Sequence, residues 1–377
     1  AIIEKGHLFV EKKSGKLDNL KESLKDAGHY SNVGIGHTRW ATHGVPTDVN
    51  SHPHCSCDKK VAVVHNGIIE NYAVLKDELI EKGYIFSSDT DSEVAAQLFS
   101  YLYTGDLLET IMEVRDRIRG SYALGIIHEE QPDKIICTRK ESPLIIGLGK
   151  DKNFIASDVP AILKYTRDVI FLENDEIAVI EEGKVTVFDK EGKPIEKEVT
   201  KIEWDMEQAS KNGYPHFMLK EIEEQPAVVE RTLEVYIKPD GKVDFGKAFE
   251  KIDFEKIKEI DIIACGTAYH AGLQAAYFFK KMAKIKTNVD IASEFRYSDP
   301  FLSEDNLVIF ISQSGETLDT LMALKLARSK GAKTLAITNV VGSTISREAD
   351  VVLYTVAGPE ISVASTKAYT TQVVTFY

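Results

Sequence analysis

The feature that most constrains the fold is a change of pattern near residue 251 of this 377-residue chain. Before that point, short strand-like segments occur in runs, with helical periodicity grouped between them. After it, strands and helices alternate one for one. Runs of strands favour an α+β layered domain with antiparallel sheets, whereas regular alternation predicts a doubly wound, mostly parallel α/β sheet. The sequence therefore predicts two domains of different class.

The predicted boundaries are 1–203 for the first domain, 204–250 for a connector containing a helix, and 251–377 for the second domain. In the first domain we expect an opening hairpin, strands at 61–69, 121–128, 133–139, 143–149 and 175–189, and helices over 71–83, 91–103 and 106–119. In the second we expect strands at 260–264, 288–291, 307–311, 334–339 and 351–355, and helices over 268–283, 318–330, 343–349 and from Ser365 or Thr366 onward.

Composition excludes several classes of protein. The net charge of -13 argues against a general nucleic-acid surface, which needs clustered Lys and Arg. Four cysteines are too few for a disulfide scaffold and fit reduced thiols in the cytoplasm. The longest apolar runs, IDIIACG and LVIFISQ, have the length of strands, whereas a membrane span needs about 18 residues. We expect a cytoplasmic globular protein with neither a nucleic-acid nor a membrane partner.

Two polar loops follow strands of the second domain, at Cys265–Ala268 and at Ser312–Thr317 (SQSGET). In doubly wound sheets, ligands bind beyond the carboxyl ends of the strands. Hydroxyls and backbone N–H groups at a helix N-terminus can hold an anion there, although ordinary helix capping is the alternative. SQSGET is neither a Walker A loop nor a G-x-G-x-x-G fingerprint. Cys265 is expected to be buried and inert.

The segments SQSGETLDT, ACGTAYHAG, IASEFRY and EISVASTKA resemble the sugar-isomerase (SIS) domain of the glutamine–fructose-6-phosphate aminotransferase family. The resemblance implies a fructose-6-phosphate site lined by Thr267, Ser312, Gln313, Ser314, Thr317 and Val363. The family often has serine at the position of Ala268, so one hydroxyl contact is expected to be missing.

Three features of the first domain suit an amide substrate. Arg39, in HTRWATHG, offers a planar fork for a carboxylate. Asn66 and Gly67 can present an amide and a backbone N–H to an oxyanion, unless they form a tight type I′ turn. Asp91 can pair with an ammonium group or cap the helix that begins near it. Five histidines lie between residues 37 and 65, near Cys55, but their spacing matches no common zinc pattern, so no metal is expected.

The segments HTRWATHG, NSHPH, VVHNGIIEN and SSDTDSEV are similar to the class II glutamine amidotransferase domain, an N-terminal-nucleophile fold. The resemblance implies that Arg39 holds the glutamine α-carboxylate, and Asp91 its α-amino group. By the same resemblance, Asn66 and Gly67 form the oxyanion hole. It also implies that Thr42 and His43 shape the pocket, and that Trp40 gates the passage of ammonia.

Together the two resemblances imply a transferase that hydrolyses L-glutamine and uses the ammonia to convert fructose-6-phosphate into glucosamine-6-phosphate. They imply no cofactor, and a homodimer for the full-length enzyme. In the family the nucleophile is a cysteine at the mature N-terminus, whereas this chain begins with Ala1 and no cysteine occupies a matching position. A second SIS subdomain would lie beyond Tyr377. We interpret the chain as a fragment truncated at both ends, and expect no glutaminase turnover from it.

Two alternatives remain open at this level. The first is a regulatory protein that binds sugar phosphate and carries a non-catalytic amidotransferase domain. The second is an amidotransferase whose acceptor is phosphoribosyl pyrophosphate or aspartate, and which needs a pyrophosphate or nucleotide loop in its second half.

Overall fold

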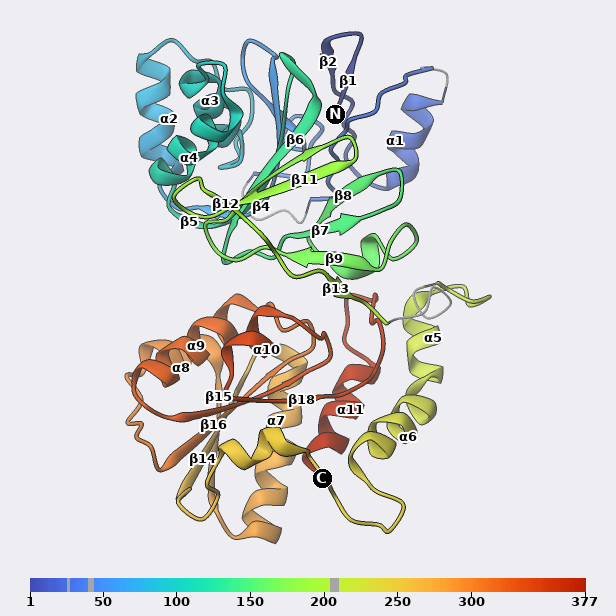
Figure 1. Cartoon of the computed structure of the whole chain (residues 1–377), viewed down its shortest axis with the longest axis vertical. Helices are drawn as coiled ribbons and strands as arrows, with labels where there is room; N and C mark the ends of the chain where they lie inside the picture. The colour runs from blue at the N-terminus through green and yellow to red at the C-terminus, as the bar shows by residue number, and fades with distance from the viewer. Residues whose placement is uncertain (26–27, 40–43, 204–209) are drawn as a thin grey trace. The chain divides into compact units, whose positions relative to one another are not determined.

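The computed structural model describes residues 1–25, 28–39, 44–203 and 210–377. Their contacts divide into two compact units, Ala1–Ile202 and Glu203–Tyr377 (Figure 1). Each unit has its own sheets and its own buried cores.

The first unit is built from antiparallel strands and four α-helices. Its strands are β1 (Ile2–Glu4), β2 (His7–Phe9), β3 (His54–Cys55), β4 (Val61–Ile69), β5 (Gly120–His128), β6 (Gln131–Lys140), β7 (Ile145–Leu148), β8 (Asn153–Ala156), β9 (Asp168–Phe171), β10 (Ile177–Glu181), β11 (Lys184–Phe188), β12 (Pro194–Ile195) and β13 (Thr200–Lys201). Its helices are α1 (Leu17–Leu24), α2 (Tyr72–Glu81), α3 (Glu93–Leu102), α4 (Leu107–Arg117) and a short 3₁₀ turn, η1 (Val159–Ala161).

Three layers make up this unit. A seven-stranded sheet has the order β12-β11-β10-β6-β5-β4-β3, and a four-stranded sheet has the order β13-β9-β7-β8. Helices α2, α3 and α4 lie on one side of the larger sheet (Figure 1). Their apolar side chains pack on this face in a cluster that includes the buried Phe99 and Tyr122. Side chains of the smaller sheet, such as Ile146 and Ile170, pack with Cys137 and Ala178 of the larger sheet. The order helix, sheet, sheet confirms the predicted α+β layering.

Local signals place most of these elements within two or three residues of the prediction. The opening hairpin is present, with Ile2 opposite Phe9. Helix α4 begins where predicted because Asp106 caps it. The Asp106 carboxylate accepts hydrogen bonds from the N–H groups of Leu108 and Glu109, which have no partner within the helix. The predicted strand 175–189 is instead a hairpin, β10–β11, broken at Gly183. The short strands β8, β9, β12 and β13 were not predicted, because segments of two to four residues are too short to show an alternating pattern.

The second unit is a parallel sheet with helices on both faces. Its strands are β14 (Glu259–Ala264), β15 (Lys286–Ile291), β16 (Asn306–Ser312), β17 (Lys333–Thr338) and β18 (Val351–Tyr354). Its helices are α5 (Phe217–Glu223), α6 (Gln225–Tyr236), η2 (Lys247–Lys251), α7 (Gly266–Phe278) with a π-helical extension η3 (Phe279–Ala283), α8 (Ala292–Tyr297), α9 (Leu318–Ser329), α10 (Thr344–Glu348) and α11 (Lys367–Phe376).

The strand order β15-β14-β16-β17-β18 places the topological switch between β14 and β16. Alternate strand residues face opposite ways, so Ile262 packs with Ala275 of α7, whereas Ile263 packs with Phe295 of α8 and with α9. The predicted doubly wound class is therefore confirmed. The short helix α8, which the sequence analysis missed, follows β15 directly.

Helices α5 and α6 are part of the second unit, and α6 is hydrogen-bonded to its edge strand. The hydroxyl of Tyr236 donates to the carbonyl of Tyr354 at 2.8 Å and accepts from its N–H at 2.7 Å. Thr232 Oγ1 also donates to the carbonyl of Thr355. Residues expected to form a separate connector are thus hydrogen-bonded across more than 100 positions to the edge strand β18.

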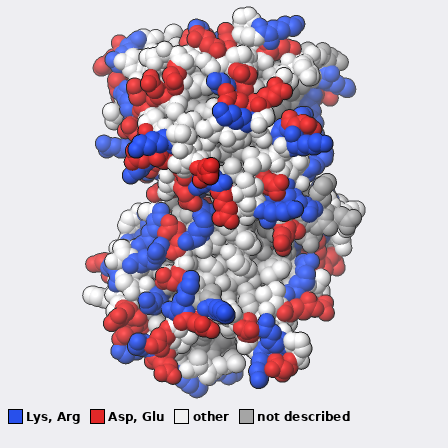
Figure 2. Space-filling view, viewed as in Figure 1, with Lys and Arg blue, Asp and Glu red and all other residues white. Residues whose placement is uncertain are grey.

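On the face drawn in Figure 2, basic and acidic side chains are interspersed on both units. In the ranges described above, no helix combines the length and the apolar character that crossing a bilayer requires.

Candidate functional site

The predicted oxyanion residues Asn66 and Gly67 lie inside β4, opposite Ala123 and Tyr122 of β5. The type I′ turn considered as an alternative is therefore wrong. Gly67 has φ of 120°, and a Cβ at this position would lie 2.0 Å from the backbone oxygen of Ser121. Only glycine fits, because both the backbone angle and the approach of β5 exclude a side chain.

A short hydrogen-bonded chain joins Asn66 to Arg39 through His37, which the sequence analysis did not single out as a site residue. The N–H of Arg39 donates to His37 Nδ1 at 2.9 Å, so the ring proton is on Nε2. Nε2 lies 2.6 Å from Asn66 Oδ1 and donates to it. Burial lowers the pKa of His37, which keeps the ring neutral and this pattern intact. The Asn66 amide is thereby oriented, with Nδ2 left as its donor group.

Asp91, in the turn that precedes α3, contacts the C-terminal end of β4. Its Oδ2 accepts a hydrogen bond from the N–H of Ile69 at 2.8 Å, and its side chain is buried. Helix α3 begins at Glu93 with Ser92 as N-cap residue and no side-chain capping bond. The helix-capping role considered for Asp91 is therefore wrong, because its carboxylate is directed to β4.

Buried histidines surround these groups. The ring centroids of His37 and His52 are 4.5 Å apart, and those of His52 and His54 are 4.7 Å apart. Burial lowers the pKa of His54 to about 3 and that of His65 to about 4. These rings are neutral at physiological pH and pack as aromatic groups.

The described part of the chain contains no group of three His, Cys, Asp or Glu side chains placed to hold a metal ion. Cys55 is partly buried, and burial raises the pKa of its thiol. Three residues assigned to the glutamine pocket, Trp40, Thr42 and His43, lie outside the described residues.

In the second unit, a pocket of about 240 Å³ lies beyond the carboxyl ends of β14 and β16. It brings together all six residues expected at a sugar-phosphate site: Thr267, Ser312, Gln313, Ser314, Thr317 and Val363. The remaining lining residues are Cys265, Ala268, Ile311, Ala364, Ser365 and Gln372. None of these lining residues carries a charge.

Two helix N-termini supply positive potential at this pocket. Thr267 lies in the first turn of α7, and Thr317 is the N-cap residue of α9, with no side-chain capping bond. Its hydroxyl instead lies 2.9 Å from that of Ser312, which accepts the N–H of Gly315 at 3.0 Å. Ser314 Oγ accepts the N–H of Glu316 at 3.2 Å. Helix capping by the Thr317 side chain is thus excluded, and this hydroxyl cluster can serve an anion.

Gly315 and Glu316 shape the loop from behind. Gly315 has φ of 68°, and a Cβ there would lie 2.0 Å from Ser343 Oγ. Glu316 accepts hydrogen bonds from the N–H and hydroxyl of Thr344, at 2.7 and 2.8 Å. Its negative charge is therefore held at the start of α10, where it is stabilised, and is directed away from the hydroxyl cluster.

Besides the apolar Ile311 and Ala364, three lining residues with polar side chains or a thiol were missed or misjudged from the sequence. Cys265 is partly exposed and lines the pocket, so the expectation that it is buried is wrong. Gln372, on α11, is buried, and its Oε1 has no hydrogen-bond partner among the described residues. Ser365 lies just before α11 and bonds to Glu360 at 3.0 Å. No local signal identifies Gln372, because it comes from a helix far along the chain.

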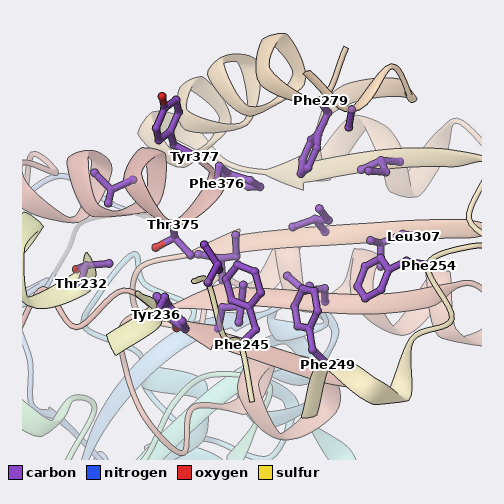
Figure 3. A pocket seen from close by; sticks show the side chains of 18 of the residues that line it. Thr232, Tyr236, Phe245, Phe249, Phe254, Phe279, Leu307, Thr375, Phe376 and Tyr377 are labelled. Carbon is purple, nitrogen blue, oxygen red and sulfur yellow. The ribbon is translucent and has the colours of Figure 1, made fainter. Parts of the chain in front are cut away.

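A larger cavity of about 670 Å³ lies on the sheet face covered by α7 and α11. Figure 3 shows that aromatic side chains from several elements, including Tyr236, Phe245, Phe249 and Phe376, surround it. An almost wholly apolar lining cannot replace the hydrogen bonds that a phosphosugar makes with water. The smaller pocket is the better candidate for a polar ligand.

Comparison with known proteins relates both units to described domains. A family profile described as "Glutamine amidotransferase domain" matches residues 37–164, and one described as "SIS domain" matches residues 253–377. A protein of Fusobacterium nucleatum named glutamine–fructose-6-phosphate aminotransferase (isomerizing) is 59% identical over 377 residues, which are 100% of this chain and 62% of that protein. A protein of the same name from Caldanaerobacter subterraneus is 54% identical over 378 residues, covering 100% of this chain and 62% of that protein.

Among solved structures, the C-terminal domain of glucosamine-fructose-6-phosphate aminotransferase from Francisella tularensis is 46% identical, over 44% of this chain and 47% of that chain, with a TM-score of 0.43. This chain thus spans 62% of the length of the two curated relatives named above.

Proposed function

We propose that this chain, which carries a glutamine amidotransferase domain followed by a SIS domain, is the substrate-binding part of an isomerising glutamine–fructose-6-phosphate aminotransferase. The observation that carries the proposal is the convergence of six separated residues on one uncharged, hydroxyl-lined pocket between two helix N-termini. Such a pocket suits a phosphate ester, because hydroxyls and helix dipoles stabilise a dianion without a cationic side chain.

In the first unit, we assign to Arg39 the α-carboxylate of L-glutamine and to Asp91 its α-ammonium group. The amide of Asn66 and the N–H of Gly67 would stabilise the oxyanion that forms when the side-chain amide is attacked. The support for this is that His37 orients the Asn66 amide and that Gly67, the next residue of β4, is exposed. No bond-making step is assigned to the cysteines of this chain.

The buried histidines favour transfer of nitrogen as ammonia. Ammonia is nucleophilic only when unprotonated, so acidic groups near the site of release would convert it into unreactive ammonium. Because His54 and His65 have pKa values of about 3 and 4, they do not donate a proton at neutral pH. We propose that ammonia then adds to the C2 carbonyl of fructose-6-phosphate, that the oxygen leaves as water to give an imine, and that isomerisation of this imine gives glucosamine-6-phosphate.

The finer parts of the proposal concern assembly and location. We propose a homodimer for the full-length enzyme, and the cytoplasm as its compartment. The four cysteines are all free in this structure, which fits a reducing environment. Sedimentation of the full-length protein tests the dimer, and a monomer at micromolar concentration would contradict it.

Calorimetry on the purified chain tests the substrate assignment. We expect one fructose-6-phosphate per chain, competition by inorganic phosphate, and no comparable binding of phosphoribosyl pyrophosphate or aspartate. Tighter binding of phosphoribosyl pyrophosphate would overturn the assignment. In the full-length protein, we expect glutamine-dependent formation of glucosamine-6-phosphate. Sugar-phosphate binding without any amino-sugar product would instead favour the regulatory alternative.

A further inference from the structure

One wall of the sugar-phosphate pocket is an irregular segment. Residues 355–366 connect β18 to α11 without forming helix or strand, and they supply Val363, Ala364 and Ser365 to the pocket. Backbone N–H groups in such a segment have no ladder to pair with, so other groups must satisfy them and hold the segment in place.

Glu221 of α5, about 140 residues earlier in the chain, meets this requirement. Its Oε1 accepts the N–H of Ile361 at 2.7 Å and that of Ser362 at 3.0 Å. Its Oε2 accepts the hydroxyls of Ser362 and Thr366, the latter at 3.0 Å. The residue is 2% exposed. Burial opposes its ionisation, but the hydrogen bonds from Ser362, Ile361 and Thr366 together hold the pKa of Glu221 below its ordinary value.

A second contact joins Glu224, the residue between α5 and α6, to the end of the segment. Lys367, the first residue of α11, is 1% exposed, and its Nζ lies 2.7 Å from Glu224 Oε2. Glu360 accepts the N–H groups of Thr366 and Ala368, at 3.1 and 2.8 Å, and so caps α11. The segment is therefore held at its end by these contacts, and at Ile361 and Ser362 by Glu221.

Resting on the sugar-phosphate site proposed above, we propose that Glu221 is a positioning residue for that site. Its carboxylate holds the backbone of residues 361–366 so that Val363 and Ser365 face the ligand. Glu221 itself is not among the residues that line the pocket. Replacing Glu221 would therefore leave every lining side chain unchanged, but residues 361–366, which form one wall of the pocket, would lose the carboxylate that holds them.

The test compares Glu221→Gln with Glu223→Gln in the purified chain. Glutamine matches glutamate in size, but its NH₂ group cannot accept the donors that one carboxylate oxygen now accepts. We expect Glu221→Gln to weaken fructose-6-phosphate binding by about tenfold or more, with the number of sites per chain unchanged. We also expect faster hydrogen exchange at the amides of Ile361 and Ser362. Glu223 is exposed on the same helix, so its variant should match the unmodified chain.

Each outcome has a distinct meaning. Equal affinity and equal amide exchange in Glu221→Gln would overturn the positioning role. Failure of the unmodified chain to bind fructose-6-phosphate would instead refute the proposed function, while amide exchange would still report whether Glu221 holds the segment. A drop in the number of sites at constant affinity would mean that part of the protein is unfolded while the folded molecules bind normally. That result would contradict the proposal.

If Glu221→Gln does not fold, the hydroxyl side of the contact is changed instead. Ser362→Ala removes one donor to Glu221 and leaves both backbone bonds in place, so we expect a smaller loss, of about threefold in affinity. An unchanged affinity in this folded variant would count against the proposal.

Discussion

The two candidate sites are held in place in different ways. In the first unit, Asn66 and Gly67 are part of the antiparallel strand β4, and the neighbouring strand β5 approaches Gly67 with its backbone. In the second unit, most of the polar groups lie at the end of β16 or in the loop that follows it, and Gly315 is approached mainly by the side chain of Ser343. Backbone cannot be trimmed or moved without breaking a sheet, whereas a side chain can be replaced. The first site should therefore tolerate change less than the second.

The largest expected effect is that of Gly67→Ala. The new Cβ would collide with the oxygen of Ser121, and alanine disfavours φ of 120°. We expect a loss of more than about 4 kcal/mol in the free energy of unfolding of the first unit, measured by denaturant titration. Gly83→Ala is the matched control, because φ is also positive there but nothing lies within 4 Å. It should cost only about 1 kcal/mol. Similar losses in both variants would contradict the backbone explanation.

Gly315→Ala should be damaging but repairable. Its Cβ would meet Ser343 Oγ at 2.0 Å and Ser343 Cβ at 2.5 Å. We expect a loss of about 2–4 kcal/mol in stability and of most fructose-6-phosphate binding. Adding Ser343→Gly removes both of these atoms and leaves an approach of 2.9 Å to Thr338 Oγ1. It should restore much of the stability and of the binding, and a double-mutant cycle measures this interaction. Gly331→Ala, with positive φ and open space, is the control for backbone strain alone. Strictly additive effects of the two substitutions would refute the side-chain contact.

Acidification should destabilise the first unit. The pKa of His65 is about 4 in the folded chain, against an ordinary 6.5, because burial disfavours its charged form. Between these values the unfolded chain binds more protons, so stability is fully present above pH 6.5 and is lost as the pH falls toward 4. The expected loss from His65 alone is on the order of 3 kcal/mol.

Calorimetric unfolding of the chain across this pH range measures the loss. His65→Gln should make the dependence shallower, because glutamine does not titrate, while His54 still contributes. An unchanged slope in that variant would assign the effect to other groups.

The smallest expected effect is on ligand binding alone. Ser314→Ala removes a hydroxyl from the pocket wall and should weaken fructose-6-phosphate binding by about 1–2 kcal/mol, measured by calorimetry. Ser329→Ala, on the exposed end of α9, is the control and should bind normally. If Ser314→Ala also binds normally, the hydroxyl serves only the loop, through its bond with Glu316.

Much of the second site follows from local sequence. SQSGET and ACGTA each follow an apolar strand, and parallel strands end at the same edge, so the residues predicted there do share a pocket. The sequence did not predict that Glu221 binds residues 361–366, the irregular segment that forms one wall of this site. The partners of Glu221 are about 140 residues away, and no local period relates a helix in the connector to a loop near residue 362.

The first site shows the same division. The residue types at Arg39, Asn66, Gly67 and Asp91 indicated amide chemistry, but the sequence could not decide between a turn and a strand for Asn66 and Gly67. The structure decides for the strand, because β5 pairs along the whole of β4. It also adds His37, whose ring fixes the direction of the Asn66 amide.

The sequence by itself thus determined the classes of the two units, the order of their longer elements and the residue types at both sites, because periodicity, turn residues and caps act over a few neighbouring positions. Only the tertiary structure decided which distant carboxylates, rings and backbone groups meet. Buried polar groups must find partners wherever the folded chain brings them, and that choice is made by the packing of the whole unit.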